Sequence, residues 1–274
     1  MIKVAVIGAA GKMGQLLIKN ILKSGDLRLS GAVGSKNSAY IGKDAGEVFG
    51  YTRCGILITD DIKTVIECSD VIIDFSTGVV VEHARIASLG GTAVVIGTTG
   101  LTEKDKNELK QIASSGGKIV CAPNMSVGVN LLFCLSEVAT KVLGANYDVE
   151  VVEMHHSHKK DAPSGTAERL VEIISKVRDF DVNSDIRYGR NRTTGERTKN
   201  EIGVHSLRGG DVVGDHSVIF ATDGERVELT HRATNRETFV HGALRAARFL
   251  VMAPAGFYDM QDVLGFRKNG DKFI

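Results

Sequence analysis

Short apolar, β-branched runs alternate with segments of helical periodicity through residues 1–125. This alternation is the strongest constraint on the fold, because consecutive parallel strands need a crossover connection that is usually a helix. The pattern therefore predicts a parallel sheet covered by helices. The strand-like runs are 2–7, 27–33, 71–75, 92–96 and 119–122, and the helix-like stretches are 13–21, 80–89 and 103–113.

The pattern changes from about residue 126. A long helix is expected over 127–143, a strand over 147–153 and a helix that includes Leu170 and Ile174. Turn dipeptides then separate strand-like runs in a hairpin pattern, which predicts a mixed or antiparallel sheet in an α+β domain. These runs are 202–207, 216–222 and 225–230, with turns at 209–211 and 223–224.

A final helical pattern, 241–251, is expected to pack back on the first domain. The sequence thus predicts two domains. The first is a dinucleotide-binding domain, 1–125, completed by 237–274. The second is a substrate-binding and oligomerisation domain, 126–236.

Composition limits the classes of partner. A formal net charge of +1 gives no overall electrostatic reason to bind nucleic acid or an anionic membrane, so a small molecule is expected. Met1 leads directly into an apolar run without a charged leader, and no apolar span long enough to cross a membrane is expected, so the chain is predicted to be cytoplasmic. The four cysteines lie far apart and are expected to be reduced and mostly buried.

The first chemical motif is a glycine-rich segment between the first strand and the first helix. Gly8 can form the tight turn, Gly11 permits close approach of a pyrophosphate to the backbone, and Gly14 permits close packing of helix on sheet. Ala10 replaces the usual middle glycine. The context predicts a Rossmann-like cofactor domain, although a strand-turn-helix without ligand is the alternative. The candidate cofactor residues here are Gly8, Ala9, Ala10, Gly11, Lys12 and Met13.

The end of the second predicted strand bears on cofactor choice. An acidic residue there would bind the ribose 2′-hydroxyl of NADH, but this chain has Gly34 followed by Ser35 and Lys36. A hydroxyl and a cation favour the 2′-phosphate of NADPH, with NADH still possible. An ordinary loop lysine is the alternative for Lys36.

Two more small or polar loops follow strands, at the sheet edge where open α/β sheets bind ligands. Each alone could be an ordinary βα turn, but together with the glycine segment they indicate one cofactor site. The candidate residues are Gly97, Thr98 and Thr99 after one strand and Ala122, Pro123, Asn124 and Met125 after the next.

Residues 153–167 combine histidines, lysines and a predicted helix start. Imidazoles exchange protons near neutral pH, ammonium groups attract anions, and free amides at a helix start bind carboxylate oxygens. Ser164 or Thr166 can cap the helix, and the amides of Gly165 and Thr166 would then face an anion. A simple capping role is the alternative for Ser164 and Thr166.

Two other interpretations concern charged segments. His155, His156, His158 and Asp161 could bind a metal, but no second cluster supports this and the adjacent lysines oppose a cation, so no metal is expected. The polar stretch 187–200 is expected to be an exposed loop, or alternatively a flap that attracts an anionic ligand. Its cations are Arg187, Arg190, Arg192, Arg197 and Lys199.

These motifs resemble those of 4-hydroxy-tetrahydrodipicolinate reductases, also called dihydrodipicolinate reductases, of bacterial lysine and diaminopimelate synthesis. The similarity runs nearly from end to end, and its most specific part is His-His-x-His-Lys-x-Asp-Ala-Pro-Ser-Gly-Thr-Ala. The segments that carry it are the glycine segment, 97–100, 122–130, 153–167, 194–197, 208–216 and 259–264.

The resemblance implies reduction of a cyclic dicarboxylate by hydride from NADPH or NADH, usually in a homotetramer. By position in the motif, His155 is the general acid-base and Lys159 the proton donor, while His156, Gly165 and Thr166 bind substrate. Gly34 departs from relatives that often have an acidic residue there, which puts cofactor preference in doubt. Another NAD(P)H-dependent dehydrogenase or a non-catalytic NADPH sensor remains an alternative.

Overall fold

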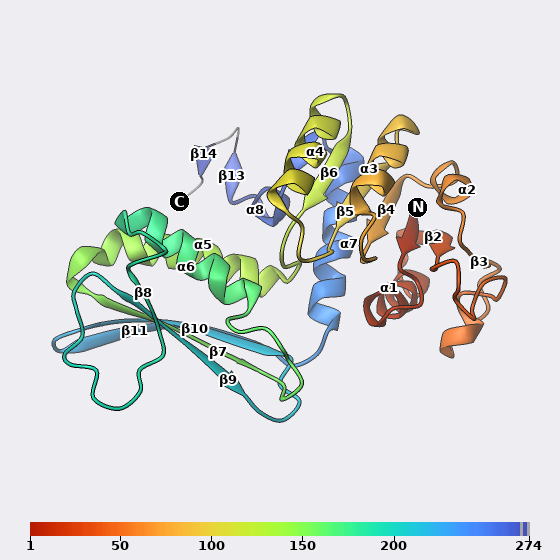
Figure 1. Cartoon of the computed structure of the whole chain (residues 1–274). Helices are drawn as coiled ribbons and strands as arrows, with labels where there is room; N and C mark the ends of the chain where they lie inside the picture. The colour runs from red at the N-terminus through yellow and green to blue at the C-terminus, as the bar shows by residue number, and fades with distance from the viewer. Residues whose placement is uncertain (269–270, 273–274) are drawn as a thin grey trace. The chain divides into compact units, whose positions relative to one another are not determined.

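The computed structural model describes residues 1–268 and 271–272, and Figure 1 shows the chain. It divides into two compact units. The first contains residues 1–126 and the segment that begins at Glu237, and the second contains residues 127–236.

A seven-stranded parallel sheet forms the centre of the first unit, in the order β12-β6-β5-β4-β1-β2-β3. The chain starts at β1, builds outward through β2 and β3, and then returns to the other side of β1 to build β4, β5 and β6. The predicted parallel sheet of Rossmann-like type is confirmed. The elements are β1 (Ile2–Ile7), α1 (Lys12–Leu22), β2 (Leu27–Val33), η1 (Glu47–Phe49), β3 (Ile58–Thr59), α2 (Ile62–Ile66), β4 (Val71–Asp74), α3 (Val80–Leu89), β5 (Ala93–Ile96), α4 (Glu103–Ser114), β6 (Lys118–Cys121), α7 (Glu237–Met252), β12 (Gly256–Tyr258), α8 (Met260–Val263), β13 (Arg267–Lys268) and β14 (Asp271–Lys272).

Apolar residues alternate between the two faces of this sheet, so both faces are covered. In β1, Val4 and Val6 belong to a core shared with α1, α7 and α8, whereas Ala5 and Ile7 belong to a core shared with α2, α3 and α4. This arrangement explains why the strands are nearly continuous apolar runs, since parallel strands buried on both faces need no polar side. Helix α7 belongs to the first core although it follows the whole second unit in the chain.

The second unit contains a five-stranded sheet in the order β11-β10-β7-β9-β8. Strands β7 and β9 are parallel, whereas β10 is antiparallel to both β7 and β11, so the sheet is mixed. The elements are α5 (Val127–Leu143), η2 (Gly144–Asn146), β7 (Asp148–His155), α6 (Gly165–Arg178), β8 (Ile186–Tyr188), β9 (Ile202–Arg208), β10 (Gly214–Thr222) and β11 (Glu225–Ala233).

One predicted hairpin is correct and one is wrong. Strands β10 and β11 pair directly across the turn at Asp223 and Gly224, as expected. Strands β9 and β10 do not pair, because β7 lies between them. The turn between β9 and β10 instead bonds to the end of β7 and the residue after it. Gly209 N–H donates to the His155 carbonyl, and His156 N–H donates to the Val212 carbonyl.

Helices α5 and α6 cover one face of this sheet (Figure 1). Leu132 and Phe133 of α5 pack with Leu170 of α6 against Val151 and Phe220 of the sheet. The expectation that no segment is apolar and long enough to cross a membrane is wrong, because Val127–Asn146 passes that test of length and composition. The core helix of a soluble protein passes the same test, and the apolar face of α5 is here part of a packed core.

The stretch 187–200 is mostly exposed, as predicted, but parts of it are held in place by the rest of the unit. Its beginning forms β8, and two of its cations are committed to carboxylates of the same unit. Arg190 contacts both oxygens of Glu150 at 2.8 and 2.9 Å, and Arg197 contacts Glu150 at 3.1 Å. Burial alone would raise the pKa of Glu150, but hydrogen bonds from Arg190, His205 and Arg197 lower it to about 2. These two arginines are therefore structural partners of Glu150.

The cysteines are more accessible than expected. All four lie among the described residues and none forms a disulfide, but Cys68 is exposed and Cys54, Cys121 and Cys134 are half-buried. The prediction that they are mostly buried is therefore wrong. Burial still raises the pKa of the Cys121 thiol to about 11, which makes that thiol a poor nucleophile.

The contact of α7 with the loop after β6 can be tested at Gly242. A Cβ atom at this position would overlap the Met125 carbonyl oxygen. Although alanine normally favours a helix, we expect Gly242→Ala to lower the free energy of unfolding by about 1–3 kcal/mol through overpacking. Urea denaturation followed by circular dichroism measures this change.

The matched control is Gly25→Ala, because a Cβ there would meet no heavy atom of the described residues within 4 Å. Its free energy of unfolding should change by less than about 0.5 kcal/mol. Equal midpoints for the two variants would contradict the close contact of α7 with the backbone at Met125.

Candidate active site

The glycine segment forms a tight turn at the end of β1. Gly8 has a φ of +81°, a conformation that favours glycine, and the N–H groups of Gly8 and Ala9 both donate to the Val33 carbonyl at 2.9 Å. A Cβ at Gly14 would overlap the Gly8 carbonyl oxygen. Glycine is therefore required for α1 to approach β1 this closely.

The start of α1 is suited to an anion. Gly11 is the N-cap and offers no side-chain cap, so the first amides of the helix are left to other acceptors, and the first turn, 12–15, contains no acidic residue. Lys12 is exposed beside them, and Ala9 is buried under the turn. This geometry fits the pyrophosphate of a dinucleotide.

The end of β2 leaves little room for an acidic side chain. Gly34 N–H donates to the Thr59 carbonyl at 2.9 Å, and a Cβ at Gly34 would lie 3.3 Å from Ile58. Ser35 begins a turn in which its carbonyl accepts from Ser38 N–H, and Lys36 is exposed. Ser35 and Lys36 are thus the polar groups that follow the strand.

The other two predicted loops lie at the same sheet edge as the glycine turn. The register pairs Ile7 with Asp74, Asp74 with Ile96 and Ile96 with Cys121, so β1, β4, β5 and β6 end together. Thr98 Oγ1 donates to the Ser76 carbonyl at 2.7 Å, which joins two of these loops. The edge therefore brings together the candidate cofactor residues of the first unit.

Burial separates those residues into two kinds. The side chains of Ala122 and Met125 are 3% and 2% exposed and belong to the core, so only their backbone can meet a ligand. Asn124 Oδ1 accepts from Ser126 N–H at 2.8 Å and shapes its loop, whereas Pro123 is exposed. Gly97 leaves room for Phe75, whose ring a Cβ at Gly97 would overlap.

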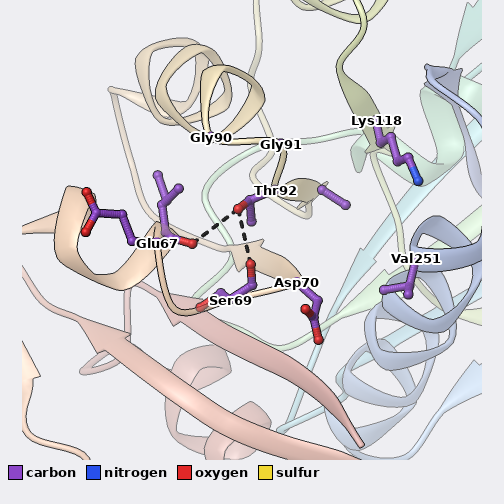
Figure 2. Close-up of a pocket in the computed structure, with 10 residues that line it drawn as sticks. Glu67, Ser69, Asp70, Gly90, Gly91, Thr92, Lys118 and Val251 are labelled. Carbon is purple, nitrogen blue, oxygen red and sulfur yellow. Dashed lines mark hydrogen bonds between the residues drawn. The ribbon is translucent and has the colours of Figure 1, made fainter.

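A pocket at the opposite edge of the sheet does not belong to this site. Figure 2 shows it where β4, β5 and β6 begin, lined in part by Asp70, Thr92 and Lys118. Thr92 Oγ1 donates to the carbonyls of Ile66 and Ser69, both at 3.2 Å. The buried Thr92 hydroxyl thus bonds to the segment that joins α2 to β4. This structural role is enough to explain a threonine at that position.

In the second unit, His155 lies at the end of β7 against a buried carboxylate. Its Nδ1 is 2.5 Å from Oε2 of Glu153, a side chain with no exposed surface. Arg208 contacts the same carboxylate at 2.9 and 3.0 Å. Burial lowers the pKa of His155, whereas Glu153 opposes that effect.

Lys159 belongs to the loop that follows. Its ammonium group is 2.7 Å from Asp161 Oδ2, and this ion pair lowers the pKa of Asp161. His156 is half-buried, and its Nδ1 is buried without a hydrogen-bond partner among the described residues. His158 is exposed.

The start of α6 is capped by Ser164, whose hydroxyl accepts from Ala167 N–H at 3.2 Å. The same hydroxyl lies 2.8 Å from Nε2 of His216, which is 3% exposed. Gly165 and Thr166 form the first turn, and Gly165 is exposed. The structure thus assigns the cap to Ser164.

The histidine segment does not form a metal cluster. Across residues 1–268 and 271–272, no group of three or more His, Cys, Asp or Glu side chains is placed to hold a metal ion. The His155 ring instead packs edge-on against His216, with their centroids 5.2 Å apart.

Comparison with known proteins agrees with these features. A family model for the N-terminus of dihydrodipicolinate reductase matches residues 2–125, and one for the C-terminus matches residues 128–264. The chain is 47% identical to the 4-hydroxy-tetrahydrodipicolinate reductase of Nitrosomonas eutropha, across 97% of this chain and 99% of the relative. The corresponding protein of Nitrosomonas europaea is 46% identical, with the same coverage.

The chain belongs to the dihydrodipicolinate reductase family. The resemblance predicted from its motifs is therefore confirmed, and membership makes the chain an oxidoreductase with a domain for a nicotinamide nucleotide. A dipicolinate-bound dihydrodipicolinate reductase from Paenisporosarcina sp. TG-14 has a similar structure, with a TM-score of 0.75 and 26% identity across 96% of this chain and 98% of that one.

Sequence reasoning gave no role to three residues of this family's histidine segment and its surroundings: Glu153, Arg208 and His216. Glu153 had a detectable signal, because it continues the inward-facing alternation of Val149 and Val151 in β7. A carboxylate at such a position needs a buried partner. Arg208 and His216 lie more than fifty residues later, and only the pairing of β7 with β9 and β10 brings them to it.

The burial of His216 predicts a dependence of stability on pH. The pKa of His216 is lowered from 6.5 to about 3, and burial is the largest cause. The positive charges of His155, His231 and Lys159 also lower it, whereas Glu153 opposes the shift. The unfolded chain therefore gains a proton at a higher pH than the folded chain. The contribution of neutral His216 to stability is fully present above pH 6.5 and is lost as the pH falls toward 3.

The free energy of unfolding of the wild type should fall between about pH 7.5 and about pH 5, and one such histidine can contribute up to about 1.4 kcal/mol per pH unit to that fall. We expect the fall to be smaller in His216→Gln. Urea denaturation at both pH values measures it. His241→Gln, which changes an exposed histidine of α7, is the control and should leave the wild-type slope unchanged. The same slope in His216→Gln and wild type would contradict a neutral, buried His216.

Proposed function

We propose that this chain reduces 4-hydroxy-tetrahydrodipicolinate to tetrahydrodipicolinate with NADPH or NADH, in lysine and diaminopimelate biosynthesis. The observation that carries the proposal is the pairing of His155 with the buried Glu153, four residues before Lys159 and shortly before the start of α6. The loop with these proton-carrying side chains is followed directly by the first amides of α6, which suit an anion. The names of the relatives, and the dipicolinate bound to the related structure, supply the substrate class.

The chemistry explains why such a loop is needed. Loss of the 4-hydroxyl group as water gives a ring with a conjugated carbon-nitrogen system. A bound nicotinamide cofactor would supply hydride to that system, and the negative charge that then develops must be neutralised by a proton. Lys159 carries a proton at Nζ, and its contact with Asp161 holds the ammonium group in place. His155 exchanges a proton as general acid-base.

Substrate carboxylates are proposed to bind at the start of α6. Gly165 and Thr166 present amides in the first helical turn, where the helix dipole favours an anion. The Ser164 hydroxyl caps the helix and is therefore not needed for substrate. His156 has a buried Nδ1 available for a polar group of the substrate.

The cofactor is proposed to bind the sheet edge of the first unit, with NADPH preferred. The amides at Lys12 and Met13 suit the pyrophosphate. Gly11, whose own N–H donates to the Gly8 carbonyl at 3.0 Å, and the turn at Gly8 with Ala9 and Ala10 suit its close approach. Ser35 and Lys36 suit a 2′-phosphate. The loops 97–99 and 122–125 are proposed to meet the nicotinamide end.

Residues 126–236 are proposed to carry the substrate contacts and the subunit contacts of a homotetramer, and 1–125 with 237–274 to carry the cofactor. A cytoplasmic location is proposed with them. The support is the family, whose members the motifs resemble along nearly the whole chain.

The proton donor is tested with Lys159→Ala. We expect kcat to fall roughly 10²- to 10⁴-fold with little change in KM, because the ammonium group interacts most strongly with the charge that develops in the transition state. The measurement follows NADPH oxidation with substrate generated by the preceding synthase.

Lys160→Ala is the matched control, since it removes the neighbouring exposed ammonium group. It should retain near wild-type kcat. A near-normal kcat in Lys159→Ala would remove that residue from the chemistry, and absence of NADPH and NADH oxidation by the wild type would refute the proposed reaction.

Cofactor preference is tested with Lys36→Glu. A carboxylate at this position would repel the 2′-phosphate, so kcat/KM for NADPH should fall about tenfold or more, while kcat/KM for NADH changes little. Lys63→Glu, an exposed site in α2 of the same unit, controls for charge alone. Equal losses with the two cofactors would contradict a 2′-phosphate contact at Lys36.

A further inference from the structure

Glu153 is a carboxylate in an otherwise apolar row of β7. It follows Val149 and Val151 on the face that packs against α5 and α6, and its side chain has no exposed surface. A buried carboxylate stays ionised only when charged or hydrogen-bonding partners compensate its lost hydration. The contacts of the Glu153 carboxylate therefore show which groups compensate its charge.

Those partners are a cation and an imidazole. Arg208 places NH1 3.0 Å from Oε2 and NH2 2.9 Å from Oε1, and His155 Nδ1 is 2.5 Å from Oε2. Burial would raise the pKa of Glu153, but the hydrogen bonds from Arg208 and His155 lower it. Glu153 is thus an acceptor, and Nδ1 of His155 is the donor in this contact.

The other nitrogen of His155 lies beside a glycine. A Cβ at Gly214 would be 3.0 Å from His155 Nε2, so glycine leaves space at that atom. The edge-on ring of His216, which hydrogen-bonds to Ser164, lies beside His155 and limits its rotation. Nδ1 of His155 is thus bonded to Glu153, and Nε2 is the nitrogen that can exchange a proton with another group.

Arg208 also connects this pair to Lys159. Its NH2 group donates to the Asp161 carbonyl at 2.6 Å, and the Asp161 carboxylate holds the Lys159 ammonium group at 2.7 Å. One guanidinium from β9 therefore bonds to the carboxylate that orients His155 and to the backbone of the residue that orients Lys159. A guanidinium can serve both acceptors at once because its N–H donors point in fixed directions in one plane.

We propose that Glu153 and Arg208 are positioning residues that fix His155 as the Nδ1–H tautomer, so that Nε2 is the atom that exchanges a proton with the substrate. The assignment to a substrate rests on the proposed function, whereas the tautomer does not. When His155 is protonated it carries hydrogen on both nitrogens. It gives the Nε2 proton to the substrate and returns to the Nδ1–H form, while Glu153 remains a carboxylate throughout.

The tautomer can be measured in the free, full-length protein. Long-range ¹H–¹⁵N correlation spectra of histidine-labelled protein distinguish Nδ1–H from Nε2–H imidazoles, and the spectrum of His155→Asn identifies the His155 signals. We expect His155 to be the Nδ1–H tautomer above its pKa. An Nε2–H tautomer would overturn the proposal without need of any variant at Glu153.

The role of the carboxylate is tested with Glu153→Gln, which keeps the shape of the side chain and removes its charge. Because Glu153 stabilises the protonated imidazole beside Lys159 and Arg208, the pKa of His155 should fall in this variant, and the limb of the kcat profile that reports His155 should move to lower pH. An unchanged His155 titration in a folded Glu153→Gln variant would overturn the proposal.

Glu150→Gln is the matched control. Glu150 lies on the same strand at an odd spacing, so it faces the other side of the sheet, where it pairs with Arg190 and Arg197. This variant should leave the His155 titration unchanged. If the wild type shows the Nδ1–H tautomer but oxidises neither NADPH nor NADH with the substrate, the positioning stands and the proposed function fails.

Discussion

The second unit depends on the compensation of one buried charge. Glu153 has no exposed surface, and removal of either partner from such an ion pair is strongly destabilising because the remaining charge keeps its desolvation penalty. Its compensation by Arg208 requires β9 to lie beside β7. The same register places Gly209 and Val212 where they bond to the backbone of the histidine loop. The pairing of β7 with β9 therefore brings together the ion pair of Glu153 and the backbone contacts of the loop that follows His155.

The first unit has a different constraint, which is close approach of backbone. Gly14 lets α1 meet the turn at Gly8, and Gly242 lets α7 meet Met125. Both contacts lie at the ends of strands, so they fix the loops that follow β1 and β6. Loops fixed in this way, around a helix start that has no side-chain cap, suit a ligand that is bound largely through its phosphates and backbone contacts.

Much of this could be predicted from the sequence. Local periodicity revealed the long strands and helices, and the glycine segment was recognisable because it lies between a strand and a helix. Short elements such as β3 and β8 were missed, since two or three residues carry no periodic signal. The pairing of β9 with β7 was also missed, because a turn between two strands does not show whether a third strand separates them. Arg208 could not be assigned a partner for the same reason.

The order of elements along the chain has a consequence for how the protein forms during synthesis. The core of the first unit includes Val240, Ala243 and Leu250 of α7, which leave the ribosome after the whole of the second unit. Until then, the sheet formed by residues 1–121 has one face without that cover. The nucleotide-binding half thus begins first and finishes last, and its apolar face is open to chaperones or to aggregation while the intervening unit is made.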